Sequence, residues 1–239
     1  MEKDLLTISE TAELLGVSVD TLRRWDEKGQ FKAFRSEGGH RYYSKEQIAN
    51  YSKDLFKLAE DWVLNKTEIP TTNYCADSAT FQARVAKMGS ELSLVSDDKI
   101  KKNFSLIVAM AGEIGNNSFD HNLGNWRDVP GIFFGFDINK KYVVLADRGQ
   151  GIFKTLKRVR PELNDDSSAL IVAFTEIVSG RAPEERGNGL KFVRNIIIKN
   201  KMKLYFKTGE AELEISDESP LAIKKTITPV KGCIALIGF

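Results

Sequence analysis

The sequence predicts an α+β fold in two parts, a small helix-rich domain followed by a larger domain of mixed helices and strands. Short stretches with helical spacing of apolar residues dominate the first part, whereas strand-like runs gather beyond residue 130. The polar stretch 67–72, around Pro70, is the expected linker. We therefore predict a first domain over 1–55, a connecting helix and linker over 56–77, and a second domain over 78–239.

Composition points to an ordinary globular protein of the cytoplasm. The net charge of +2 excludes a global basic field, so any nucleic-acid signal has to be local. Cys75 and Cys233 lie far apart, which offers neither a disulfide framework nor a zinc site. We expect no membrane association, because the N-terminus lacks an apolar signal stretch and the run 142–146 is far too short to span a bilayer.

The first fifty residues predict two short helices, a hairpin and a third helix. Ser9 can cap the first helix, and Ser18 can cap the second after a break at 16–18. Gly29 suits the position just past the end of the second helix. The paired strands are predicted around the glycine turn 36–39, and they carry Phe31, Phe34, Tyr42 and Tyr43. Ser44 is the expected cap of the third helix.

The rest of the chain alternates helical and extended patterns. Helices are predicted over 51–66, 78–94, 102–121, 166–179 and 189–200. Strands are predicted over 131–138, 142–146, 203–208, 211–215 and 233–239. We find neither an internal repeat nor a low-complexity tract.

Basic residues concentrate between residues 21 and 45, where seven lysines and arginines face three acidic residues. A helix, a three-residue break and a second helix form the pattern of a helix-turn-helix. The segment 5–50, with its TLRRW core and GGHRYY turn, resembles the winged helix-turn-helix of MerR-type regulators and phage excisionases. The resemblance implies that the helix from Ser18 enters the major groove of DNA and that the hairpin follows the backbone.

The residues expected at the DNA share this helix and hairpin. They are Ser18, Thr21, Arg23, Arg24, Arg35, His40 and Arg41. A helical adaptor that no longer contacts DNA is the alternative, although a merely solvated face would not need its arginines grouped in this way.

Three segments of the second domain carry polar chemistry in a fixed order. Glu113, Asn117 and His121 are four residues apart and share one helix face, where they suit a polar ligand better than a core. The segment 147–152 (Asp-Arg-Gly-Gln-Gly-Ile) follows a strand and permits a tight turn. The segment 185–190 (Glu-Arg-Gly-Asn-Gly-Leu) opens a helix, where free backbone N–H groups favour phosphate.

In this order, the three segments resemble the nucleotide-binding motifs of the GHKL superfamily, and the ExxxNxxxH form is most similar to anti-sigma factor kinases. The resemblance implies a two-layer α/β sandwich of Bergerat type that binds ATP and Mg²⁺. Glu113 would be the general base and Asn117 the magnesium ligand. Asp147 would accept a hydrogen bond from the adenine amino group. The other nucleotide-binding residues implied are Gly149, Gly151, Ile152, Gly187, Asn188, Gly189 and Leu190.

Several details of this resemblance are less regular. Residues 153–186 would form a lid, with Arg181 or Arg186 near the phosphates, and His121 and Arg186 would lie behind the residues that contact the nucleotide. For His121, a helix-capping role and a catalytic role are equally open. Cys233 follows a glycine where many relatives carry threonine, and Asn188 replaces a small or aliphatic residue. An α/β domain whose glycines only turn corners is the alternative for any one motif.

Three functions remain open. The first is a DNA-binding regulator whose ATP-binding module changes its affinity or partners, with a homodimer as the assembly that the MerR resemblance implies. The second is a serine/threonine kinase or partner-switching ATPase acting on a STAS-like or sigma-factor-like protein, and the third is a module that binds ATP without catalysis. A sensor histidine kinase is disfavoured, because the only histidines are His40 and His121 and neither lies on a separate dimerisation helix.

Overall fold

The computed structural model divides the chain into two compact units, Met1–Tyr74 and Cys75–Phe239. It describes residues 5–15, 17–29, 31–52, 54–176 and 189–239, although not the side chains of 49–52. Each unit is described by itself below. Among the described residues, no helix is both long and apolar enough to cross a membrane.

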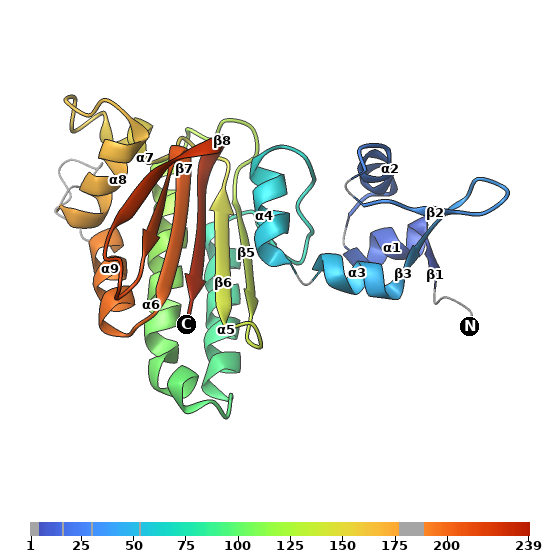
Figure 1. Ribbon diagram of the computed structural model, residues 1–239, viewed down its shortest axis with the longest axis horizontal. Coiled ribbons are helices and arrows are strands. Elements are labelled where there is room, and N and C mark those ends of the chain that lie inside the picture. Colours follow the sequence, from blue (N-terminus) through green and yellow to red (C-terminus); the bar gives the residue numbers. More distant parts are fainter. Residues whose placement is uncertain (1–4, 16, 30, 53, 177–188) are drawn as a thin grey trace. The chain divides into compact units, whose positions relative to one another are not determined.

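The first unit consists of a short strand, two helices, a hairpin and two further helices (Figure 1). Its elements are β1 (Leu5–Thr7), α1 (Ile8–Leu15), α2 (Val19–Glu27), β2 (Phe34–Arg35), β3 (Arg41–Ser44), α3 (Lys45–Ser52) and α4 (Leu55–Val63). The strands form an antiparallel sheet in the order β1-β3-β2. The predicted pair of helices followed by a hairpin is confirmed.

Local capping explains where these helices begin and end. The Ser18 hydroxyl accepts a hydrogen bond from the backbone N–H of Thr21 at 3.1 Å, as expected of the cap of α2. Gly29 follows that helix with a φ of +70°, a conformation that glycine adopts without strain. Ser44 likewise accepts from the backbone N–H three residues on, at 3.0 Å.

Two expectations for the segment before residue 45 are wrong. Ser9 lies inside α1, and the reciprocal cap is made instead by Thr7 and Glu10, whose side chains each accept the other's backbone N–H. Phe31 is not in a strand. It stacks on Tyr43 with ring centroids 4.9 Å apart, and both rings are buried in the core of the unit. Burial of the ring therefore outweighs its strand propensity.

The helix expected over 51–66 is two helices. α3 continues to Ser52, and α4 starts afresh at Leu55, because the Asp54 carboxylate accepts the backbone N–H of Lys57 at 2.9 Å. An aspartate at this position offers the chain a cap in place of a continuous helix. The boundary between the two units falls after Tyr74, within the segment 56–77 expected to connect the domains.

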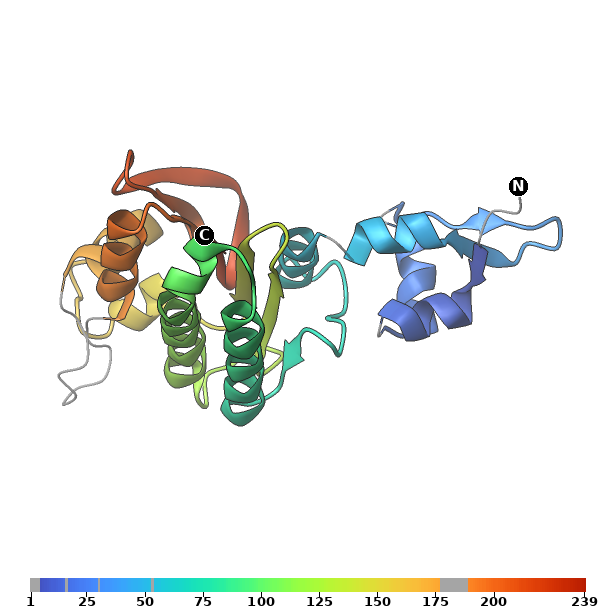
Figure 2. The same cartoon turned by 90° about the horizontal axis from the view of Figure 1, so that it is seen from below.

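The second unit packs helices against one face of an antiparallel sheet (Figures 1 and 2). Its elements are β4 (Tyr74–Cys75), α5 (Ser78–Ser93), α6 (Asp98–Asn122), β5 (Ile132–Asp137), β6 (Tyr142–Asp147), α7 (Ile152–Leu156), α8 (Asp166–Thr175), α9 (Gly189–Lys199), β7 (Lys203–Ile215) and β8 (Ala222–Gly238). The strand order is β4-β5-β6-β8-β7. Apolar residues of α5, α6, α9 and the facing side of the sheet form one core.

The C-terminal strands are longer than their sequence predicts. Residues 203–208 and 211–215 form a single strand, β7, with a bulge at Gly209, and β8 begins at Ala222 rather than at residue 233. The first half of β8 is charged, and Lys224 pairs across the hairpin with Glu214 at 2.9 Å. Cross-strand ion pairs can stabilise an exposed hairpin whose residues do not alternate between apolar and polar. The hydrophobic pattern of the sequence therefore did not predict the first half of β8.

Helix α6 is the longest helix described and starts earlier than expected, because Asp97 caps it by accepting the N–H of Ile100 at 3.1 Å. It crosses α5 closely at Gly115, where an added Cβ would overlap the ring of Phe81. Gly112 lies one turn earlier, and a Cβ there would meet nothing within 4 Å.

We expect Gly115→Ala and Gly112→Ala to change stability in opposite directions. Gly115→Ala should lower the free energy of unfolding by about 1–3 kcal/mol, because the methyl group overpacks the contact with Phe81. Gly112→Ala should raise it by about 0.5–1 kcal/mol through helix propensity alone. Urea unfolding of both variants measures the difference, and equal shifts would contradict the close crossing.

Candidate functional sites

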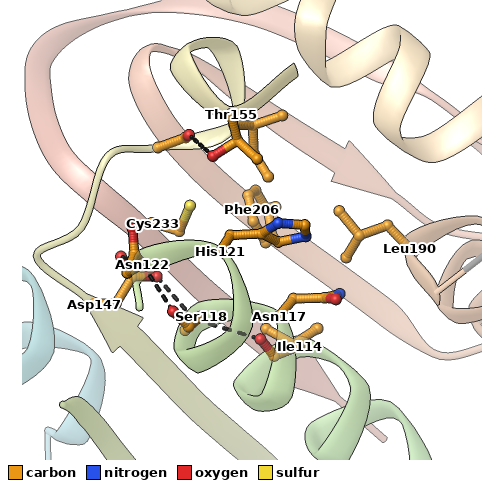
Figure 3. A pocket seen from close by; sticks show the side chains of 12 residues that line it. Ile114, Asn117, Ser118, His121, Asn122, Asp147, Thr155, Leu190, Phe206 and Cys233 are labelled. Carbon is orange, nitrogen blue, oxygen red and sulfur yellow. Dashed lines mark hydrogen bonds between the residues drawn. The ribbon is translucent and has the colours of Figure 1, made fainter. Parts of the chain in front are cut away.

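A cleft in the second unit opens between α6, the end of β6, the loop into α7 and the start of α9 (Figure 3). The lining residues are Ile114, Asn117, Ser118, His121, Asn122, Asp147, Gly151, Ile152, Thr155, Leu190, Phe206 and Cys233. The polar groups come mostly from α6 and the strand ends, and the walls are apolar.

The floor of this cleft is the carboxylate of Asp147, which is 2% exposed at the end of β6. It accepts hydrogen bonds from the Ser118 hydroxyl at 2.8 Å, the Gly149 backbone N–H at 2.8 Å and the Asn122 amide at 3.4 Å (Figure 3). Burial raises the pKa of Asp147 above its usual value, against the opposing effect of these donors. The chain therefore holds a costly buried acid in one orientation.

Asn122 fixes the loop that follows Asp147. Its side-chain oxygen accepts the backbone N–H of Gln150 at 2.9 Å, while the Gln150 amide donates to the backbone carbonyl of His121 at 2.8 Å. Gly149 packs so tightly against Asn122 that an added Cβ would overlap the amide. The glycine in this loop is thus required by a close approach, and it supports the site without lining the cleft.

Glu113 and Asn117 lie together beside the start of α9. The Asn117 amide donates to the Glu113 carboxylate at 3.5 Å, and a Cβ on Gly189 would overlap that carboxylate. Leu190 and His121 line the cleft nearby. The structure therefore brings together residues of all three motifs, although the roles assigned to them stay predictions.

Part of the predicted site lies outside the described residues, namely Arg181, Arg186, Gly187 and Asn188. Sequence reasoning also missed residues that line the cleft, which are Ser118, Asn122, Thr155, Phe206 and Ile114, and it missed Thr208, which bonds the loop beside the cleft. The first two share a stripe on α6 one residue along from Asn117, a spacing that could have identified them. Thr208 accepts the backbone N–H of Ile152 at 3.2 Å from a neighbouring strand, which no local pattern reveals.

Cys233, the departure from the expected threonine, lies in the same cleft with its Sγ 3.6 Å from the Thr208 hydroxyl. Burial raises the pKa of its thiol well above the usual value. A thiol with so little thiolate is a weak nucleophile. Burial of Cys233 therefore disfavours a role as a thiolate nucleophile in this cleft.

The second candidate site is the face of α2 in the first unit. Leu22 and Trp25 are buried, while Arg23 and Arg24 are exposed. Arg23 pairs with Asp20 at 2.7 Å, and Arg24 pairs with Glu68 at 2.7 Å. Both ion pairs are exposed, so they are weak enough to be exchanged for phosphate contacts.

Thr21 needs a correction. Its side chain is fully buried, and its hydroxyl lies 2.9 Å from that of Ser18, where it completes the cap of α2. A fully buried hydroxyl engaged in this way cannot reach DNA. Ser18, Arg35 and His40 are exposed or lie at the hairpin, and their DNA contacts stay predictions.

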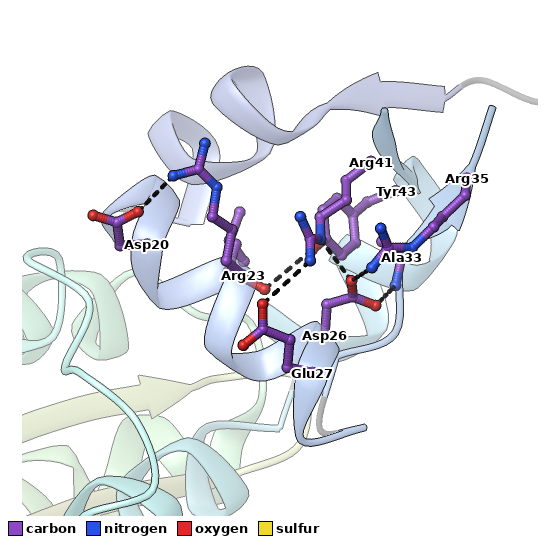
Figure 4. A network of polar contacts seen from close by, with 9 residues as sticks. Asp20, Arg23, Asp26, Glu27, Ala33, Arg35, Arg41 and Tyr43 are labelled. Carbon is purple, nitrogen blue, oxygen red and sulfur yellow. Dashed lines mark hydrogen bonds and ion pairs between the residues drawn. The ribbon is translucent and has the colours of Figure 1, made fainter. Parts of the chain in front are cut away.

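A buried ion network joins α2 to the hairpin (Figure 4). The carboxylate of Asp26 accepts from the Ala33 backbone N–H at 3.0 Å, from Arg35 at 2.7 Å and from Arg41 at 2.6 Å. Burial opposes ionisation of Asp26, but these three donors together hold its pKa below the usual value. Arg41 also approaches Glu27 at 3.4 Å.

Comparison with known proteins identifies the first unit. Residues 7–43 match the model of the MerR family regulatory protein, so the chain carries a MerR-family helix-turn-helix domain at its N-terminus. This match supports a DNA-binding regulator.

Two further similarities extend over most of the chain. It is 26% identical over 215 residues to the type II methyltransferase M.Eco47II of Escherichia coli, an alignment covering 82% of this chain and 49% of that protein. The chain thus spans about half the length of this curated relative. A solved structure, the N-terminal domain of a DNA repair protein, covers 69% of this chain and 42% of its own at 14% identity, with a TM-score of 0.30. Similarity that low does not establish a shared fold.

We expect Asn122→Ala to destabilise the second unit by about 1–3 kcal/mol, because it leaves the Gln150 N–H without its acceptor and Asp147 without one donor. Asn125→Ala is the matched control, since Asn125 is exposed and bonds only a nearby carbonyl. Thermal unfolding measures both variants. Equal melting temperatures would show that Asn122 does not hold the loop.

Proposed function

We propose that the chain is a DNA-binding regulator whose second unit binds Mg-ATP and thereby changes its affinity for DNA or for a protein partner. The MerR-family domain supports the first half of this proposal. The second half rests above all on one observation, the buried carboxylate of Asp147 at the floor of a cleft that also carries Asn117 next to Glu113.

We infer that the second unit is a sandwich of the Bergerat (GHKL) type. Helices α5, α6 and α9 against one face of the sheet are consistent with its two layers. The three motifs that resemble that superfamily line or adjoin a single cleft. This arrangement favours the resemblance over the alternative in which the glycines only allow tight turns of the backbone.

The floor of the cleft suits the adenine ring. Ile114, Ile152 and Phe206 offer apolar walls to a flat heterocycle, and the Asp147 carboxylate is an acceptor for an exocyclic amino group. Gly151 has a φ of +79° beside the cleft, a backbone conformation that disfavours any larger residue there. A ring carrying a carbonyl in place of the amino group would leave the buried carboxylate facing another acceptor.

The α9 end of the cleft suits the phosphates and magnesium. Among the described residues, no cluster of three or more His, Cys, Asp or Glu could hold a metal ion, so a protein-only cage is absent there. Mg²⁺ usually takes one or two protein ligands and completes its shell with phosphates and water. The Asn117 amide fits that need, and bound Mg²⁺ would neutralise phosphate charge. The N-terminus of α9 at Gly189 offers backbone N–H groups to the same anion.

Glu113 decides between the catalytic and non-catalytic forms of this proposal. A carboxylate beside Asn117 can orient water or a substrate hydroxyl, which supports a serine/threonine kinase or partner-switching ATPase as the second candidate. Its substrate would be a STAS-like or sigma-factor-like protein, an idea that rests on analogy with anti-sigma systems alone. A module that binds ATP without turnover is the third form.

The similarity to a methyltransferase of Escherichia coli raises methyl transfer as an alternative to ATP binding in the cleft. A mechanism through a cysteine thiolate is disfavoured, since burial raises the pKa of Cys75 to about 11 and that of Cys233 well above its usual value. S-adenosylmethionine also carries adenine, so the cleft by itself does not separate the two ligands. Binding measurements do.

We expect calorimetry to detect Mg-ATP binding to the full chain, and Asp147→Asn to weaken it at least about tenfold by replacing a carboxylate acceptor with an amide. Asp217→Asn, in the exposed β7–β8 turn, is the control and should leave the affinity unchanged.

Glu113→Gln should bind ATP normally and lose any hydrolysis or transfer. Tighter binding of GTP or S-adenosylmethionine than of ATP would refute the proposed ligand.

For the DNA half, we expect the chain to retard a fragment from its own locus and Mg-ATP to change the affinity. Arg23→Gln should weaken DNA binding. It should also make the plot of log K against log salt concentration less steep by about 0.9, the value for one phosphate contact. Light scattering of the free and DNA-bound chain tests the proposed homodimer. A chain that binds no such fragment at low salt would not be a DNA-binding regulator.

A further inference from the structure

The hairpin and α2 of the first unit are joined at one side chain. The Asp26 carboxylate, 5% exposed, receives donors from three points of the segment 33–41: the Ala33 backbone, Arg35 on β2 and Arg41 on β3. All three distances are 3.0 Å or shorter. Figure 4 shows these donors converging on the carboxylate from the hairpin side. A single residue of α2 therefore binds both strands.

The position of the Asp26 carboxylate is unfavourable for a negative charge by itself. Asp26 lies in the last turn of α2, where the helix dipole disfavours negative charge, and on a unit expected to meet phosphates. A buried ionised group without partners is strongly destabilising. Because Arg35 and Arg41 neutralise it, the arrangement is stable only while the hairpin stays against the helix.

Arg41 is committed to this contact. Its side chain is 19% exposed, its Nε donates to Asp26, and a terminal nitrogen lies 3.4 Å from Glu27. Arg35 is 50% exposed, and one of its terminal nitrogens makes the ion pair. To reach phosphate, Arg41 would have to give up its Nε bond and leave Asp26 with only the Arg35 and Ala33 donors, whereas the half-exposed Arg35 keeps donors for a second partner.

We propose that Asp26 is the positioning residue that sets the hairpin relative to α2 for DNA reading, and that Arg41 acts through Asp26 and not on phosphate. This inference rests on the proposed DNA binding and assigns different roles to the arginines. Arg23 and Arg35 face the nucleic acid, and Arg41 holds the hairpin. The tip of the hairpin, with Gly39 and His40, then meets the backbone at a fixed angle to the helix.

The test is a double-mutant cycle on DNA affinity with Asp26→Asn, Arg41→Gln and the double variant of the full chain. We expect each single change to weaken binding about tenfold or more, and the double variant to be no weaker than the worse single one. Salt slopes should stay at the wild-type value, because no phosphate contact is lost. Asp20→Asn, which breaks the exposed pair with Arg23, is the control and should not weaken binding.

Two results would overturn the proposal. If Asp26→Asn binds DNA as tightly as the wild type or more tightly, the carboxylate does not set the hairpin for DNA binding. If Arg41→Gln lowers the salt slope by about 0.9 and its effect adds to that of Asp26→Asn, Arg41 contacts phosphate directly. Arg41→Lys separates the two roles of this arginine: a phosphate contact tolerates lysine, whereas the Nε contact does not, so we expect lysine to fail like glutamine, and retained binding would contradict the proposal.

A measurement without DNA separates this inference from the proposed function. The Ala33 amide proton should exchange faster in Asp26→Asn than in the wild type, because its acceptor loses charge. Absence of DNA binding in the wild type would reject the regulator. Unchanged exchange at Ala33 together with unchanged DNA affinity would reject the role of Asp26.

Discussion

A carboxylate buried at the end of a central strand has to find its donors among the elements around it, and much of the second unit is arranged accordingly. Asp147 draws one donor from its own loop, one from the backbone of Cys233 on β8 and two from α6, so the helix has to present Ser118 and Asn122 toward the strand end. Glycine at 149 then follows from the closeness of Asn122, and Gly232, at a φ of +75°, leaves room for Asp147 from the neighbouring strand. The cleft is the space that these contacts hold open.

The sequence predicts the features of this protein that are encoded locally. Ser18, Gly29 and Ser44 identify helix ends because capping depends on a few adjacent residues. Glu113 and Asn117 are recognisable because four-residue spacing places them on one helix face. The helices 78–94 and 189–200 agree with the structure to within one residue at each end.

What the sequence did not reveal depends on contacts between distant segments. Thr208 reaches the loop of Ile152 across 56 positions of chain, and Asp26 meets Arg41 across 15. The first half of β8 is held by pairing with β7 and by ion pairs, so its own pattern carries little apolar signal. Thr21 looked like part of a reading surface, yet its hydroxyl is used to close the helix start.

The contact between Gly189 and Glu113 couples the register of one helix to the rotamer of one acid. A slip of α9 by one residue, roughly 1.5 Å along its axis, would bring the side chain of Leu190 toward the space that Gly189 leaves empty. The carboxylate would then have to rotate away from Asn117. The orientation of the Glu113 side chain therefore depends on the register of α9, so a shift of this helix would alter the polar end of the cleft without any large movement of the sheet.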